Sequence, residues 1–255
     1  MIQESRFRKG KEIAMLAMRE IGASLAALNL YPLGLMQPRE EGAPHHLIDV
    51  INPRPILLVH GIVHNQSAFF SLKQHFDALS WKNIFTINYS TRHGSMTQMV
   101  DQLAQRVEEI LESTQTNQID IVAHSLGGLV SRYYMSVGGG RGKVKRLITL
   151  GTPHKGTSLS FLLRGLTISG LTDDLRQGSY LMNLLNETTL PRGTKIISIY
   201  PSFDWAVWPT TNSKVDGLPR TAFKNYEIEG VSHMGLLFSN KVADLIVNAI
   251  GAEDR

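Results

Sequence analysis

Beyond residue 53, two patterns of hydrophobic positions alternate along the chain. Short stretches rich in apolar residues lie at 55–61, 83–90, 118–124, 145–151, 194–201 and 224–230. Between them, apolar residues repeat at spacings of three and four, as at Met96, Met99, Val100 and Leu103. The first pattern is typical of strands buried on both faces and the second of amphipathic helices. Their order predicts an α/β domain over 53–255, with a mainly parallel central sheet and helices on both faces.

One interval between two predicted strands, from Thr152 to Gly193, is longer than a plain connection in a compact domain. It contains helical patterns of its own. We therefore predict a helical lid insertion over about 157–190. Its many leucines are explained equally well by a lid that opens on an interface and by a cap packed on its own domain.

Residues 1–52 form a predicted N-terminal amphipathic helical extension, with the helix itself over 5–30. Its apolar positions repeat at helical spacing: Ile13, Leu16, Ala17, Ile21, Leu25 and Leu28. The helix either packs on the domain through this face, or touches a membrane or caps a site, as its basic start suggests. Arg19 and Glu20 interrupt the apolar run too early for a removable signal, and no stretch approaches the ~18 apolar residues of a membrane span. A cytoplasmic or membrane-peripheral protein is expected, and secretion without a cleavable signal also fits.

Composition and net charge exclude several kinds of site and partner for this protein. The 255 residues are 42% hydrophobic, enough for a sizeable core, and include no cysteine, which excludes disulfides and thiolate metal sites. The net charge of +4 is too small for a nucleic-acid footprint, so no nucleic-acid partner is expected. His45 and His46 are adjacent and would not share one helix face, and no other metal-ligand spacing occurs. We expect no metal and no cofactor.

Candidate chemistry begins in "IDIVAHSLGGLV", where an apolar strand is followed by small residues and a helix-compatible segment. A serine nucleophile on a strained strand-to-helix turn needs small residues two positions before and after it. Ala123 and Gly127 meet this need around Ser125, although alanine replaces the usual first glycine. We predict Ser125 as the nucleophile; the plain alternative is a glycine-rich turn.

A serine needs a base, and the base needs a carboxylate to orient it. In this arrangement the chain order is serine, acid, histidine. His233 follows the last predicted strand and is favoured as the base, whereas His154 is more simply a structural residue. Asp204 follows the penultimate strand and is favoured as the acid over Asp216, which lies in a turn-forming Asp-Gly pair.

An oxyanion needs preorganised N–H donors. The amide of Leu126, directly after the nucleophile, is one candidate, and that of Ile62, after "VHG", is the other. Trp205 and Trp208 flank the predicted acid loop. They either line a substrate pocket or pin the loop to the core.

These residues resemble the α/β-hydrolase fold and, within it, the bacterial true lipases and esterases. The likeness is carried by five stretches, "VHGI" (59–62), "AHSLGG" (123–128), "GTPHKGT" (151–157), "GSYLMNLLN" (178–186) and "GVSHMGLLFS" (230–239). The resemblance implies a triad of Ser125, Asp204 and His233 with oxyanion amides from Ile62 and Leu126. A single residue after His-Gly, instead of a glycine run, looks like the subclass that prefers medium or long acyl chains.

The sequence therefore predicts a serine hydrolase for carboxylic esters, a lipase or esterase acting on acylglycerols or other lipid esters. An acyltransferase, an amidase or a membrane-lipid deacylase would use the same triad. A non-catalytic binding module on this fold is the alternative from a different class.

Overall fold

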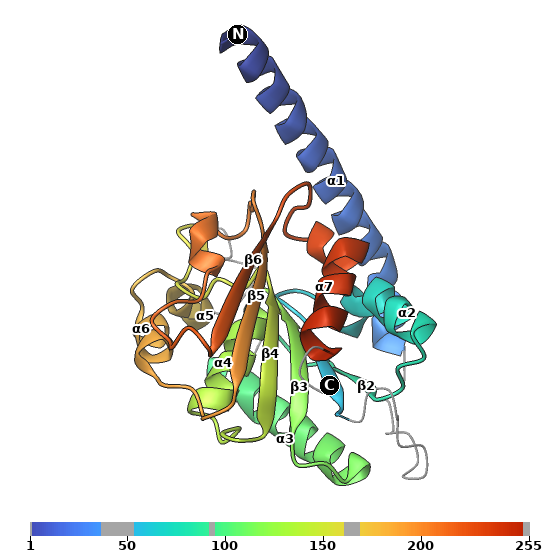
Figure 1. The fold of residues 1–255 in the computed structure, drawn as a ribbon, viewed down its shortest axis with the longest axis vertical. Coiled ribbons are helices and arrows are strands. Elements are labelled where there is room, and N and C mark those ends of the chain that lie inside the picture. Colours follow the sequence, from blue (N-terminus) through green and yellow to red (C-terminus); the bar gives the residue numbers. More distant parts are fainter. Residues whose placement is uncertain (1, 37–53, 92–94, 161–168, 252–255) are drawn as a thin grey trace.

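The computed structural model describes residues 2–36, 54–91, 95–160 and 169–251. The described strands form one six-stranded sheet in the order β2-β1-β3-β4-β5-β6 (Figure 1). Every neighbouring pair is parallel, as predicted. The strands are β1 (Ile56–Val59), β2 (Ile84–Ile87), β3 (Ile119–His124), β4 (Val144–Leu150), β5 (Lys195–Pro201) and β6 (Phe223–Ile228).

Helices connect the strands and cover both faces of the sheet. They are α1 (Ile2–Met36), η1 (Gln66–Phe69), α2 (Phe70–Ala78), α3 (Met96–Thr114), α4 (Leu126–Ser136), α5 (Ser169–Asp174), α6 (Tyr180–Glu187), η3 (Thr210–Ser213), η4 (Gly235–Phe238) and α7 (Asn240–Gly251). Helix α3 begins where its sequence predicts: the Ser95 hydroxyl accepts from the Gln98 amide at 3.3 Å, and the Gln98 side chain accepts from the Ser95 amide at 2.9 Å. This reciprocal cap satisfies two amides that the first helical turn leaves unpaired.

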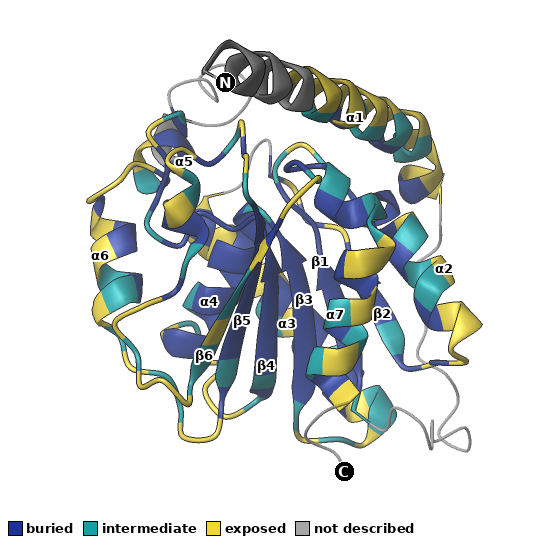
Figure 2. Cartoon of the chain, turned by 45° about the horizontal axis from the view of Figure 1, so that its top comes forward, coloured by how far each residue is buried: buried dark blue, intermediate teal, exposed yellow. Residues whose placement is uncertain are grey.

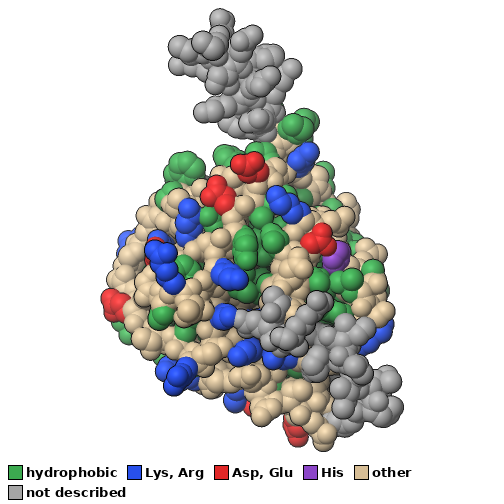
Figure 3. Space-filling model, in the orientation of Figure 1, with side chains coloured by type: hydrophobic (Ala, Val, Ile, Leu, Met, Phe, Trp, Pro, Cys, Tyr) green, Lys and Arg blue, Asp and Glu red, His purple; other side chains and the backbone are tan. Residues whose placement is uncertain are grey.

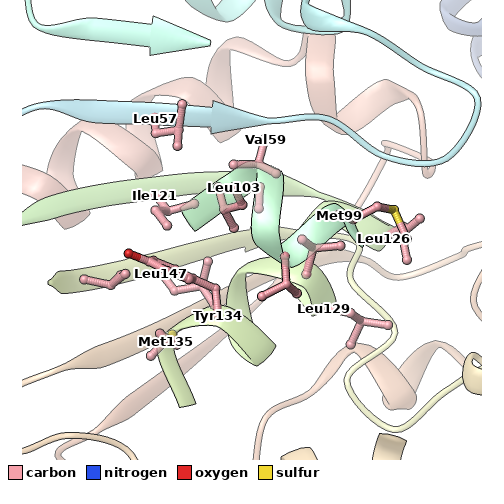
Figure 4. Packing of buried hydrophobic residues seen from close by; sticks show 14 of the residues in the cluster. Leu57, Val59, Met99, Leu103, Ile121, Leu126, Leu129, Tyr134, Met135 and Leu147 are labelled. Carbon is pink, nitrogen blue, oxygen red and sulfur yellow. The ribbon is translucent and has the colours of Figure 1, made fainter. Parts of the chain in front are cut away.

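Two hydrophobic layers hold the sheet. On one face Leu57, Ile121 and Leu147 pack against α3 and α4, and Figure 4 shows Leu103, Leu129 and Tyr134 of these helices in the same cluster. On the other face the strands pack against α2 and α7. Strands β1 to β5 appear mainly dark blue in Figure 2 because nearly every position is buried, which explains their largely apolar sequences. The edge strand β6 is mostly half-buried or exposed.

The register places the ends of β1 and β3 side by side. Val59 pairs with Ala123, so the chain leaves both strands at the same edge of the sheet. After β1 the chain passes to β2, and it then returns across β1 to β3. Such a reversal of strand order is where open α/β sheets form ligand sites.

The N-terminal helix is longer than predicted and packs through a different face. Ile21, Leu25 and Leu28 of the predicted apolar face are 60%, 54% and 68% exposed, whereas Ala27 and Glu20 are buried. Helix α1 does pack on the domain, against η1 and η4, but these three residues of the predicted apolar face point away from it. Figure 2 shows α1 crossing one end of the sheet with mainly exposed positions outward.

Side chains of the domain hold the end of α1. Asn65 Nδ2 donates to the Tyr31 carbonyl at 2.8 Å, and Gln66 Nε2 and Asn88 Nδ2 donate to the Gly34 carbonyl at 3.1 and 3.0 Å. These bonds satisfy carbonyls that the last turn of a helix leaves without partners. The C-terminal part of α1 is thus anchored on the segments that follow β1 and β2.

The predicted insertion over 157–190 contains α5 and α6, and its residues 161–168 lie outside the described part. Its described leucines Leu171, Leu181 and Leu185 are buried in the cluster around α4. This placement agrees with a cap packed on its own domain. The pair His45–His46 also lies outside the described residues.

Candidate active site

A cavity of about 410 Å³ opens at the carboxyl ends of β1 and β3. It brings together five of the residues predicted from the sequence: Ile62, Ser125, Leu126, Trp205 and His233. Most of the remaining wall is apolar. Such a concave, largely apolar space with a few convergent polar groups is typical of small-molecule sites.

Ser125 lies on a strained turn between β3 and α4. Its φ of 52° and ψ of −122° are rarely adopted by a residue with a side chain. The turn is fixed by its backbone: the Ser125 amide donates to Leu150 O at 2.9 Å, and its carbonyl accepts from Gly128 N at 3.1 Å and Thr152 Oγ1 at 2.9 Å. The strand-turn-helix context required of a nucleophile elbow is present.

Gly127 shows why small residues surround this serine. A Cβ atom at position 127 would lie 2.5 Å from the carbonyl oxygens of both Val59 and His60. The first turn of α4 therefore passes directly against the end of β1. A larger residue would separate Ser125 from the loop that carries Ile62.

Asp204 and His233 are joined by a hydrogen bond of 2.8 Å between Oδ2 and Nδ1. Both side chains are almost fully buried. The other carboxylate oxygen, Oδ1, accepts from the amides of Ala206 and Val207 at 2.8 and 3.0 Å. The carboxylate can only accept, so Nδ1 carries the proton and Nε2 is the ring nitrogen that can take one from a substrate or nucleophile.

Two opposing effects set the basicity of His233. Burial disfavours its charged form, but the Asp204 carboxylate, its hydrogen bond and the charge of Glu20 outweigh burial and raise the pKa of His233 above 6.5. A raised pKa is the property expected of a general base that must accept a proton during the reaction.

Ile62 and Leu126, the predicted oxyanion donors, line the same cavity as Ser125. Among the residues that the structure describes, neither amide donates to a protein acceptor. Leu126 also occupies the first position of α4, where the helix dipole favours negative charge. Both N–H groups are therefore available for an anionic oxygen.

Three further histidines surround the site and favour their neutral forms. Burial, followed by weaker interactions that include neighbouring histidines, lowers the pKa of His60 and of His64 to about 4 and that of His124 well below 6.5. His64 and His124 line the cavity with His233. His233 is thus the histidine of this cluster whose environment favours protonation.

The two alternatives weighed in the sequence lie elsewhere. Asp216 is exposed and forms an ion pair with Lys155. His154 is buried between Thr149 Oγ1, at 2.9 Å from Nε2, and Arg132 Nη1, at 3.4 Å from Nδ1. Burial, with repulsion from Arg132 and Lys155, holds its pKa well below 6.5, which fits a structural residue.

The two tryptophans differ in position. Trp205 lines the cavity and its ring lies edge-on to His233, 6.1 Å between centroids. Trp208, the other candidate for substrate binding, is not among the described residues that line it. The chain turns at Val207, whose side chain is buried, and this leaves the Trp208 indole 53% exposed.

Helix α1 contributes to the site, which was one of the alternatives for this helix, but sequence reasoning did not identify the residues involved. Ser24, Ala27, Leu28 and Tyr31 line the cavity, and Glu20 accepts hydrogen bonds from both loops that carry Asp204 and His233. The available signal was Glu20 itself, a carboxylate between the apolar positions Leu16 and Ile21 of this helix. In the described part of the chain, no group of three or more His, Asp or Glu residues is placed to hold a metal ion.

A family model described as "Domain of unknown function (DUF7379)" matches residues 34–164, just over half of the chain. The chain belongs to this family. The matched region includes Ile62, Ser125 and Leu126, whereas Asp204, His233 and Glu20 lie outside it.

Solved structures of several lipases share the fold. Lipase B of Aspergillus fumigatus has a TM-score of 0.65 and 16% identity, over 80% of this chain and 53% of the other. The mature Bacillus licheniformis lipase BlEst2 has a TM-score of 0.60 and 21% identity, over 82% and 96%. A monoacylglycerol lipase of Paleococcus ferrophilus has a TM-score of 0.59 and 12% identity, over 83% and 96%.

These similarities establish the α/β-hydrolase fold for this chain, as the sequence resemblance implied. The chain spans about half the length of the Aspergillus lipase and nearly the whole of the other two. At identities of 12–21%, the likeness concerns the fold.

Proposed function

We propose that this protein is a serine hydrolase that cleaves carboxylic esters with apolar acyl groups, such as acylglycerols or other lipid esters. The observation that carries the proposal is the 2.8 Å bond between Asp204 and His233 at a cavity that also exposes Ser125. Similarity in fold to proteins named lipases supports the same class.

In the proposed reaction, the Ser125 hydroxyl attacks the ester carbonyl carbon while His233 Nε2 takes its proton. The amides of Ile62 and Leu126 bind the oxyanion of the tetrahedral intermediate. His233 then protonates the departing alkoxide, and the acyl group remains on Ser125. Water, deprotonated by His233, attacks the acyl-enzyme. The bond between the acyl carbon and Ser125 Oγ then breaks, His233 returns the proton to Oγ, and the carboxylic acid leaves.

The apolar wall supports a lipid-like acyl group. Leu28, Leu126, Leu159 and Leu175 all line the cavity near Ser125. Alkyl chains gain about 0.8 kcal/mol for each methylene removed from water, so turnover should increase with acyl length until the cavity is filled.

Intact-mass measurement after treatment with a long-chain p-nitrophenyl alkylphosphonate tests this proposal. We expect one adduct on Ser125 by peptide mapping, no adduct on Ser125→Ala, and hydrolysis of p-nitrophenyl esters of increasing acyl length. Labelling elsewhere, or none with detergent present, would overturn it. Adding a competing alcohol separates the alternatives, because an acyltransferase would form a new ester and a hydrolase a free acid.

We also propose that the exposed face of α1 contacts a lipid surface, which would make the protein membrane-peripheral. Met18, Ile21 and Leu25 are exposed on this face, and Leu28 is both 68% exposed and part of the cavity wall. Figure 3 shows hydrophobic side chains in green where α1 joins the rest of the molecule. The apolar face therefore continues into the cavity mouth, as a surface that delivers lipid esters would require.

Charge favours an anionic lipid surface as the occupant of this face. The sequence before it contains Arg6, Arg8, Lys9 and Lys11, and the whole chain carries +4. Basic residues near an anionic bilayer each contribute about 1 kcal/mol of attraction. No helix in the described residues is long and apolar enough to cross a membrane.

Co-sedimentation with vesicles tests this contact. Wild type should bind vesicles containing phosphatidylglycerol more tightly than vesicles of phosphatidylcholine alone, and Leu25→Gln should reduce binding. Val137→Gln removes an apolar side chain of similar exposure at the end of α4 and should bind as wild type does. Equal binding by all variants, or a dimer in light scattering that Leu25→Gln disrupts without any vesicle binding, would contradict the proposal.

A further inference from the structure

Glu20 is the point at which α1 meets the candidate active site. Its side chain is buried, and its carboxylate accepts from the Met234 amide at 3.1 Å to each oxygen and from the Gly235 amide at 3.4 Å. It also accepts from the Ser232 hydroxyl and from Trp205 Nε1. A carboxylate with this many donors is well compensated for burial.

The donors to Glu20 lie beside the two residues that form the Asp204–His233 pair. Ser232 and Met234 are the neighbours of His233 on either side, and Trp205 is the neighbour of Asp204. The Glu20 carboxylate therefore links the loop that carries Asp204 to the loop that carries His233, although it is not itself part of the Asp204–His233 pair. Neither loop has regular secondary structure at these positions, so their relative placement depends on such contacts.

The Asp204–His233 bond orients the imidazole relative to Asp204, but it does not fix the His233 loop relative to Ser125. Glu20 contacts the residues on both sides of His233, through the Ser232 hydroxyl and the Met234 amide, and so limits the movement of this loop. We infer that Glu20 is a positioning residue: it fixes the His233 and Asp204 loops against each other, so that α1 forms part of the catalytic unit. The inference rests on the proposed function and adds a residue outside the 34–164 family match.

The charge of Glu20 also acts on His233, together with the other groups that face this ring. Asp204 from the loop after β5 and Glu20 from α1 raise its pKa, after burial, which lowers it. His124 at the end of β3 and His64 after β1 face it as neutral imidazoles. Removing the Glu20 charge while keeping its shape should therefore lower the pKa of His233.

Glu20→Gln is the main test, with Glu112→Gln on the exposed side of α3 as the matched control. Misplacement of a catalytic group by about 1 Å can cost ~10²-fold in rate, so we expect kcat on a short soluble ester to fall by about 10- to 100-fold. The KM should change little, because Glu20 does not line the cavity. The acid limb of kcat/KM should move to lower pH, whereas Glu112→Gln should match wild type in every measurement.

A merely structural role would lower the melting temperature without moving the acid limb. Glu20→Asp keeps the charge but shortens its reach, so it should restore the acid limb while kcat stays low. If Glu20→Gln does not fold, Ser232→Ala removes one donor and leaves the charge. It should lower kcat severalfold without lowering the pKa of His233. Wild-type kcat in Ser232→Ala and Glu20→Asp, or in Glu20→Gln, would overturn the inference.

Failure of the proposed function would be visible separately. If wild type cleaves no ester and Ser125 takes no phosphonate, the hydrolase proposal fails. NMR titration of the His233 imidazole, assigned with His233→Gln, still compares wild type with Glu20→Gln in that case. An unchanged His233 pKa would overturn the link between Glu20 and His233, whatever the activity.

Discussion

His124 Nε2 lies 3.2 Å from the carbonyl oxygen of His233, so the residue before the candidate nucleophile holds the backbone of the candidate base. The carbonyl can only accept, which places the proton of His124 on Nε2. Burial, with repulsion from His233 and His64, lowers the pKa of His124 well below 6.5 and keeps this ring neutral. The end of strand β3 therefore positions both candidates: Ser125 follows the strand directly, and His124 holds the backbone of His233.

Replacing the acid should reduce turnover far more than it affects the fold. Asp204→Asn keeps the size of the side chain but removes the charge that stabilises the imidazolium and can reverse the tautomer of His233. We expect kcat on a p-nitrophenyl ester to fall by ~10⁴-fold, as in other serine triads. Asp216→Asn is the matched control, because Asp216 pairs with Lys155 at the surface. Equal losses in both variants would show that Asp204 has no special role.

The rate should depend on pH through His233. The base acts only when it is neutral, so activity should fall as the pH decreases through its pKa. Because the Asp204 and Glu20 charges outweigh burial, we expect the midpoint of the acid limb of kcat/KM above pH 6.5. A profile of kcat/KM between pH 5 and 9 measures it. A midpoint near 4 would instead indicate that a lowered-pKa histidine such as His64 is the base.

The stability of the fold should also rise with pH, through His60 and His64. In the unfolded chain His60 and His64 take up protons near pH 6.5, but in the folded chain only near 4. Between these values the unfolded state binds more protons, so the free energy of unfolding should rise from pH 4 to 6.5. Urea unfolding at pH 5 and 7 measures the difference, which His64→Gln should reduce. His233, with its raised pKa, adds a smaller loss of stability as the pH rises above 6.5.

Local sequence signals were sufficient for much of the fold and part of the site. The apolar strands, the Ser95 cap and the small residues around Ser125 act over a few positions, so their structural consequences could be read directly. Asp204 and His233 each follow the end of a strand, β5 and β6. In a parallel sheet these ends lie at the same edge as the end of β3, so the two residues could be predicted to lie near Ser125.

The role of Glu20 could not be found in this way. Its partners Trp205 and Ser232 are 185 and 212 residues away, and no local pattern records such a contact. The face through which α1 packs could not be predicted for a related reason. Periodicity identifies an apolar face but not what that face meets, and here Ala27 and Glu20 face the domain while Ile21 and Leu25 face outward.

The close approach of α4 to β1 makes a sharp prediction for one glycine. In Gly127→Ala, the added Cβ would meet the carbonyl oxygens of Val59 and His60 at 2.5 Å, and backbone atoms cannot move aside as a flexible side chain can. We expect a loss of about 1–3 kcal/mol in the free energy of unfolding, as for other overpacked sites. The kcat should also fall by more than the loss of folded protein accounts for, because the shift widens the space between Ser125 and the Ile62 amide.

The control variant is Gly22→Ala on α1. It has no atom within 4 Å of its new Cβ and should leave the free energy of unfolding unchanged or slightly raised. Urea unfolding and kcat on a short ester measure both variants, and a Gly127→Ala protein with wild-type stability and turnover would contradict the packing described for this turn.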